Sequence, residues 1–184
     1  YLPGSEYRPR QRSGAHRRLA IGMVRLVGTK SSRQVVFGFM VATAACSMWI
    51  SNTATVLMML PIAMALLGGS HHEMRIPLLL GIAYAASIGG MATPIGTPPN
   101  VFFMDQYELA TGTAMGFTEW MKVGVPVAVT MVPITCLWLT RSLKGAPNFD
   151  LPDPGPWRAA EKRVLTVFAI AAILWITRTH PFGG

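Results

Sequence analysis

One stretch constrains the fold more than any other, because residues 35–70 contain no charged side chain. As a single helix this stretch would be about 54 Å long, whereas the hydrocarbon core of a bilayer is about 30 Å thick. Two complete crossings need about 40 residues. Its polar residues gather midway, at Ser47, Ser51-Asn52-Thr53 and Thr55. We therefore predict a re-entrant helical hairpin over residues 34–72, with its polar tip lying inside protein or along a watery cavity.

The composition places this hairpin in a membrane protein. The chain is 51% hydrophobic and 13% charged, compared with about 25% charged residues in an average soluble domain. The net charge is +8, and half of the basic residues fall in the arm formed by residues 1–33. Because apolar segments of bilayer length accompany this arm, we expect it to be cytoplasmic and exclude nucleic acid as its partner. Within it, His16–Val27 has the spacing of an amphipathic helix on the membrane surface.

The next apolar segment, residues 73–104, is predicted to be a discontinuous transmembrane helix. We expect helix to about Gly90 and a broken stretch at Ala92–Asn100, because Pro98 and Pro99 lack N–H groups and restrict the residues before them. Helices broken at mid-membrane are where secondary transporters bind their solutes. This segment therefore joins the hairpin tip as a candidate binding element.

The rest of the chain alternates between polar and apolar segments. We place every Lys/Arg cluster on the cytoplasmic side. Residues 105–122 then form an outer connection and residues 123–142 a transmembrane helix. Residues 143–158 form a cytoplasmic linker, and residues 159–178 the start of a next transmembrane helix. The predicted fold class is an all-α integral membrane protein.

The two polar breaks carry side chains that suit ions. The start of the returning helix, at Ser51–Thr53, would offer unpaired N–H groups and partial positive charge to an anion. The carbonyls ending the first arm, with the Ser47 and Ser51 hydroxyls and the Asn52 amide oxygen, suit a small hard cation such as Na⁺. Helix capping explains the same residues equally well by spacing alone. A second hydroxyl-bearing break at Gly96-Thr97 favours binding over capping.

Other chemistry is absent from the sequence. We find no nucleophile–base constellation, phosphate-binding loop or metal-type cysteine spacing, so we predict no enzyme activity and no cofactor. Residues 35–70 and 76–104 contain no ionisable Asp, Glu, Lys or Arg, which disfavours a proton relay. A bound cation would then be neutralised by a bound anion, so that each raises the affinity for the other.

The segments SMWISNTATVLMMLPIA and GIAYAASIGGMATPIGTPPN strongly resemble the divalent anion:sodium symporter family, whose members transport di- and tricarboxylates and whose relatives transport sulfate. The similarity covers roughly residues 16–181. It implies a bacterial inner-membrane transporter with an inverted repeat, a homodimeric assembly and elevator motion. It assigns a sodium site to Ser47, Ser51, Asn52 and Gly96, and substrate contacts to Ser51, Asn52, Thr53 and Thr97.

The sequence departs from that family in one respect, since it contains one SNT motif where the inverted repeat has two. We therefore expect the chain to be part of a longer protein and to supply half of a binding site. The favoured function is sodium-coupled symport of a succinate-like dicarboxylate. The alternatives are transport of sulfate, citrate or another oxyanion by the same architecture, and a non-transporting membrane scaffold in which the polar breaks are structural caps.

Overall fold

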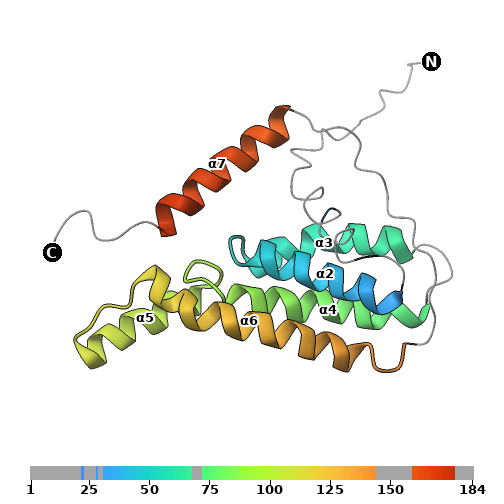
Figure 1. Cartoon of the computed structure of the whole chain (residues 1–184), viewed down its shortest axis with the longest axis horizontal. Coiled ribbons are helices and arrows are strands. Elements are labelled where there is room, and N and C mark those ends of the chain that lie inside the picture. The colour runs from blue at the N-terminus through green and yellow to red at the C-terminus, as the bar shows by residue number, and fades with distance from the viewer. Residues whose placement is uncertain (1–21, 23–27, 29–30, 68–71, 144–158, 177–184) are drawn as a thin grey trace, which may run out of the picture.

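The computed structural model describes residues 22, 28, 31–67, 72–143 and 159–176, and this part of the chain is helical with no strand. Figure 1 shows its order: α2 (Ser32–Ser47), α3 (Asn52–Leu67), α4 (His72–Gly90), α5 (Pro98–Thr111), α6 (Phe117–Leu139) and α7 (Ala159–Ile176). The all-α prediction is confirmed for these residues. Apart from Gly22, the expected surface helix at His16–Val27 lies outside them, as does nearly all of the linker at 143–158.

The predicted hairpin is formed by α2 and α3, which run antiparallel on either side of a tip at residues 48–51 (Figure 1). The Ser31 hydroxyl begins α2 by accepting a hydrogen bond from the Gln34 N–H at 3.3 Å, as is common at helix N-termini. Each arm has 16 residues, or about 24 Å of helix. The two helices therefore overlap most of residues 34–72, and re-entry of this segment into a membrane stays a prediction.

Helix α4 is the centre of the bundle, because it packs against α2, α3 and α6. Its approach to α2 is close: a Cβ on Gly89 would collide with the backbone of Ala44, so only glycine allows this separation. The shared core between α2 and α4 consists of fully buried apolar side chains, namely Val35, Val36, Phe39, Met40, Leu78 and Ile82. This packing fixes α2, and with it the hairpin tip, against the C-terminal end of α4.

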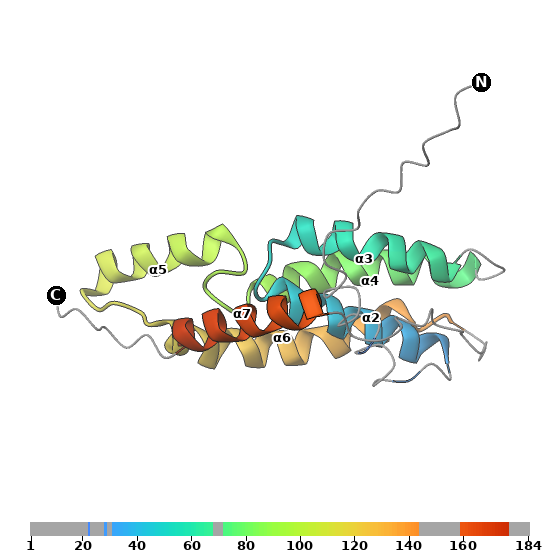
Figure 2. The ribbon, with the colours of Figure 1, turned by 90° about the horizontal axis from the view of Figure 1, so that it is seen from above.

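The break after α4 spans residues 91–97 and is shorter than the predicted Ala92–Asn100, because α5 already begins at Pro98. Proline is favoured in the first turn of a helix, where its missing N–H has no intrahelical acceptor. Helix α5 then projects past the hairpin tip (Figures 1 and 2). It continues to Thr111, so part of the expected outer connection at 105–122 is helical and the link to α6 is confined to residues 112–116.

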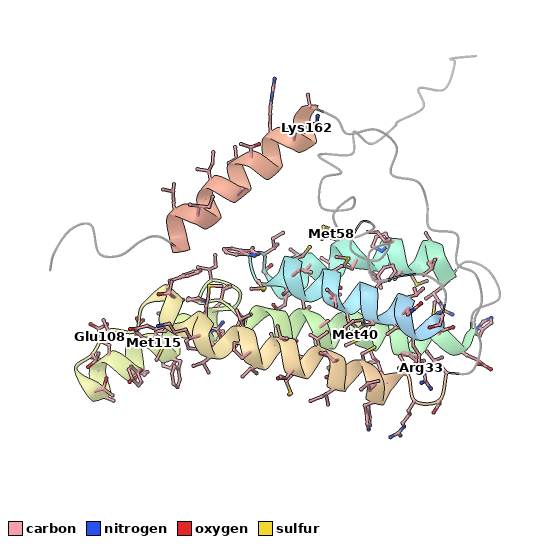
Figure 3. All side chains as sticks on the ribbon, viewed as in Figure 1. Arg33, Met40, Met58, Glu108, Met115 and Lys162 are labelled. Atoms are coloured by element: carbon pink, nitrogen blue, oxygen red, sulfur yellow. The ribbon has the colours of Figure 1, made fainter. Side chains whose placement is uncertain are left out.

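Charge is separated along the bundle. Arg33 and Glu108 lie at opposite ends of the molecule in Figure 3, and the Arg33 guanidinium donates to the Arg141 carbonyl at 3.5 Å at the basic end. Helix α6 connects the two ends and is contacted by α7. With 23 residues, α6 is the one helix of the described part that is long and apolar enough to cross a membrane by length and composition.

Candidate functional site at the hairpin tip and the helix break

The site begins with the hydroxyl of Ser47, the last residue of α2, whose side chain is fully buried. Its Oγ lies 2.7 Å from Asn52 Oδ1, across the hairpin tip, and 2.7 Å from the Ala86 carbonyl oxygen in α4. Three oxygens from three helices thus meet at one buried point. None of them belongs to a charged group, so the point is polar without carrying net charge.

Asn52 is held against α4 by a contact that only glycine permits. A Cβ on Gly90 would lie 2.5 Å from Asn52 Oδ1, and one on Gly96 would collide with the Gly90 carbonyl oxygen. Because neither residue has a side chain, the Asn52 amide, the end of α4 and the end of the break come together. Of the residues predicted to bind sodium, Ser47 and Asn52 are therefore in contact, and Gly96 adjoins Gly90, which in turn adjoins Asn52.

Two side chains fasten the break to the hairpin and to itself. The Thr93 hydroxyl donates to the Met48 carbonyl, which joins the break to the tip. The Asn100 amide nitrogen donates to the carbonyls of Gly90 and Thr93, both at 2.8 Å. Asn100 is buried and satisfies carbonyls that the end of a helix would otherwise leave unpaired. These two carbonyls of the break are thereby hydrogen-bonded within the protein.

Helix α6 closes the break from another side. The Trp120 indole nitrogen donates to the Met91 carbonyl at 2.9 Å, and a Cβ on Gly124 would lie 2.6 Å from that same oxygen. At the hairpin tip, the rings of Trp49 and Phe117 are stacked with their centroids 6.4 Å apart. The tip and the break are therefore packed together by α2, α3, α4 and α6.

The remaining predicted residues are more exposed than Ser47. Ser51 and Thr53 are exposed at the tip, and Ser51 caps α3 by accepting from the Ala54 N–H at 3.4 Å. Thr97 is half-buried, precedes α5 and makes no side-chain capping bond, so its hydroxyl is not used to begin that helix. Ser51 thus has the capping role that spacing alone also allowed, while the roles predicted for Thr53 and Thr97 stay predictions.

Sequence reasoning missed the α4 side of the site. It assigned no role to the Ala86 carbonyl, which is 39 residues from Ser47, or to Thr93 and Asn100. The paired glycines at 89 and 90 were the available signal, since adjacent glycines in an apolar helix often mark close backbone approach. Among the described residues no group of three or more His, Cys, Asp or Glu could hold a metal.

Known proteins resemble this chain over most of its length. A family model described as citrate transporter matches residues 10–183. The sodium-dependent dicarboxylate transporter SdcS of Staphylococcus aureus, in strains USA300, NCTC 8325 and MRSA252, is 36% identical over 191 residues, covering 91% of this chain and 36% of the relative. The chain thus spans about a third of the length of these curated relatives. Because the family match extends over nearly the whole chain, the chain belongs to the citrate transporter family.

Proposed function

We propose that this chain supplies one half of the sodium and carboxylate site of a sodium-coupled dicarboxylate symporter in a bacterial inner membrane. Its relatives are named as sodium-dependent dicarboxylate transporters, which supports a transporter rather than an enzyme. Sodium would be held by Ser47, Ser51, Asn52 and Gly96. The substrate would contact Ser51, Asn52, Thr53 and Thr97.

The observation that carries the proposal is the surroundings of the Ser47 hydroxyl. Its single hydrogen can serve one acceptor, yet Asn52 Oδ1 and the Ala86 carbonyl both lie 2.7 Å from Oγ. A small cation bound among these oxygens would explain why two acceptors lie next to one hydroxyl hydrogen, because hard cations prefer oxygen ligands. Rotating the Asn52 amide by half a turn would also remove it, by turning Nδ2 towards Ser47. Sodium dependence of stability and transport distinguishes these two solutions.

The anion has a place next to this cation. Helix α3 begins at Asn52, so the N–H groups of its first turn face the tip, where a helix N-terminus carries partial positive charge. Thr53 and Thr97 add hydroxyl donors for a carboxylate. Since residues 35–70 and 76–104 lack Asp, Glu, Lys and Arg, the two bound ions neutralise each other. A coupling free energy of about 1–3 kcal/mol between two sites is typical and is the basis of symport here.

The helix lengths support a re-entrant hairpin. Two arms of about 24 Å are shorter than a hydrocarbon core of about 30 Å, so the tip would stop within the membrane. Both outer ends of the hairpin lie at the end of the bundle that carries Arg33 and Arg141 (Figure 3). By the positive-inside rule this end is cytoplasmic. We place residues 73–104 across the membrane and Glu108 on the outer side.

The packing also supports movement of the site as one body. The hairpin, α4 and α6 share a core and enclose the tip and the break, so a displacement of one element carries the others. We propose that this unit moves in an elevator-type cycle within a homodimer, as the family resemblance implies. The basic arm at residues 1–33 would then lie on the cytoplasmic surface of the bilayer.

Citrate is the second candidate substrate, because the matching family model is described as citrate transporter while the relatives are named for dicarboxylates. Hydroxyls and helix N–H groups bind a carboxylate group in the same way whether the substrate carries two such groups or three. We therefore place the substrate among the di- and tricarboxylates and rank succinate-like dianions first.

The test is uptake by the full-length protein in proteoliposomes. We expect an inward sodium gradient to drive accumulation of radiolabelled succinate, with weaker uptake of citrate and none of sulfate, and choline to fail as a replacement for sodium. Asn52→Ala should abolish uptake, whereas Ser87→Ala should retain it, because the exposed Ser87 hydroxyl only donates to Ala83 in its own helix. Equal uptake in sodium and choline would refute the sodium-coupled function.

A further inference from the structure

Thr55 in α3 has an unusual hydroxyl. Its side chain is fully buried, and in the described part of the chain its Oγ1 is the buried side-chain oxygen or nitrogen that has no hydrogen-bond partner. The other buried threonines of the bundle are satisfied: Thr43, Thr93 and Thr140 each donate to a backbone carbonyl. A buried polar group left unpaired costs about 1–3 kcal/mol. A valine would fill the same space without that cost, so the hydroxyl requires an explanation.

The unpaired Thr55 hydroxyl does not donate to a backbone carbonyl of its own helix. Threonine in a helix commonly donates to the carbonyl four residues earlier, which for Thr55 is that of Ser51. That carbonyl accepts from the Thr55 backbone N–H at 3.0 Å, but not from the Thr55 hydroxyl. The hydroxyl is therefore available to a partner outside its own helical turn.

The helix register places Thr55 at the level of the buried oxygens. Asn52 precedes it by three residues, so the two lie on neighbouring positions of one helix face, and Thr55 is about 4.5 Å further from the tip. In the antiparallel α4, Ala86 precedes Gly90 by four residues and is about 6 Å further from the break. Because Asn52 lies against Gly90, Thr55 and Ala86 are at matching depth.

The face that carries Thr55 is the one that packs inward. Its neighbours at helical spacing, Met59, Ile62 and Ala63, are the other buried residues of α3, and α3 packs mainly on α4. Opposite, Ala86 of α4 has a small buried side chain and lies four residues before Gly90, which meets Asn52 of α3. Thr55 thus faces the helix whose Ala86 carbonyl lies 2.7 Å from the Ser47 hydroxyl.

We propose that Thr55 supplies an additional oxygen ligand to the cation site formed by Ser47, Asn52 and the Ala86 carbonyl. This inference rests on the proposed sodium function and adds a residue to it. A bound cation would then explain both the unpaired Thr55 hydroxyl and the two acceptors that lie next to the Ser47 hydroxyl. A sodium ion takes several oxygen ligands, and Thr55 contributes one that neither the SNT motif nor the break provides.

The experiment measures thermal unfolding of the purified full-length protein as NaCl replaces choline chloride at constant ionic strength. We expect Thr55→Val to unfold in choline at the same temperature as the wild type or higher, because it removes an unsatisfied group. The sodium concentration giving half of the stabilisation should rise about tenfold, as for loss of a hydrogen-bonding partner of a charged group. Thr55→Ala, a second variant without the hydroxyl, should show the same rise, and Thr55→Ser should resemble the wild type.

Thr130→Val is the matched control, because the exposed Thr130 hydroxyl lies 2.9 Å from the Pro126 and Val127 carbonyl oxygens and donates within its own helix. It should leave the sodium midpoint unchanged. A wild-type midpoint in both Thr55→Val and Thr55→Ala would overturn the assignment of Thr55 while leaving the proposed function standing. A wild-type protein that sodium does not stabilise would overturn the proposed function and this assignment together.

Discussion

The Ser47 hydroxyl and the Asn52 amide oxygen lie 2.7 Å apart across the hairpin tip, five residues from each other in the chain. One is the last residue of α2 and the other the first of α3. This contact closes the tip over the point where α4 arrives with its Ala86 carbonyl. It joins the two features that sequence alone identified separately, the polar tip and the broken helix.

Replacing Ser47 with alanine should impair sodium binding more than folding. Ser47→Ala removes the hydroxyl shared by Asn52 and Ala86, and the loss of one buried hydrogen bond costs about 1–3 kcal/mol. We expect the sodium concentration for half-maximal succinate uptake to rise at least about tenfold. Ser87→Ala, which removes an exposed hydroxyl from α4, should transport like the wild type. Equal sodium dependence in the two variants would contradict a role for Ser47.

Adding one methyl group at Gly90 should displace the Asn52 amide. The new Cβ would lie 2.5 Å from Asn52 Oδ1, and overpacking of this kind typically costs about 1–3 kcal/mol. We expect Gly90→Ala to lower the unfolding temperature and to abolish sodium-driven uptake. Gly116→Ala provides the control, because its Cβ would meet nothing closer than a Glu119 carboxylate oxygen at 3.7 Å. Normal uptake by Gly90→Ala would show that Asn52 need not stay in place.

Changing the amide of Asn100 to a carboxylate should loosen the break. Asn100→Asp replaces the nitrogen that donates to the Gly90 and Thr93 carbonyls with an oxygen that repels them. We expect faster amide hydrogen exchange in residues 91–97 and a lower unfolding temperature, with a smaller effect for Asn100→Ala because it adds no repulsion. Thr111→Val, at an exposed hydroxyl that donates to Tyr107, should leave exchange in the break unaltered. Unchanged exchange in Asn100→Asp would mean that other contacts hold the loop.

The proposed topology predicts opposite accessibility of the two ends of the bundle. In oriented membrane vesicles, a membrane-impermeant maleimide should label Gln34→Cys and His72→Cys from the cytoplasmic side and Glu108→Cys from the outer side. The native Cys46 and Cys136 are buried, so background labelling should be low. Labelling of Gln34→Cys and His72→Cys from opposite sides would exclude the hairpin with both ends in the cytoplasm.

Much of the architecture could be predicted because its causes are local. A charge-free stretch interrupted by Ser51–Thr53 specifies two short helices and a turn, and the helical hairpin is observed there. The glycines and prolines after Gly90 specify a break. The break was predicted too long because Pro98 was treated only as a helix breaker, whereas in the first turn proline favours the helix that it begins.

The sequence by itself determined the chemistry of the site, since it concentrated hydroxyls and an amide in apolar segments without charge, and membrane burial of such groups demands partners. Only the tertiary structure decided which oxygens meet. The approach of Ala86 to Ser47 and of Gly90 to Asn52 depends on how closely α2 and α3 pack on α4, and the unpaired Thr55 is visible only once that packing is known. Periodicity shows which face of a helix is buried, but contacts between distant residues follow from the shapes of the packed surfaces.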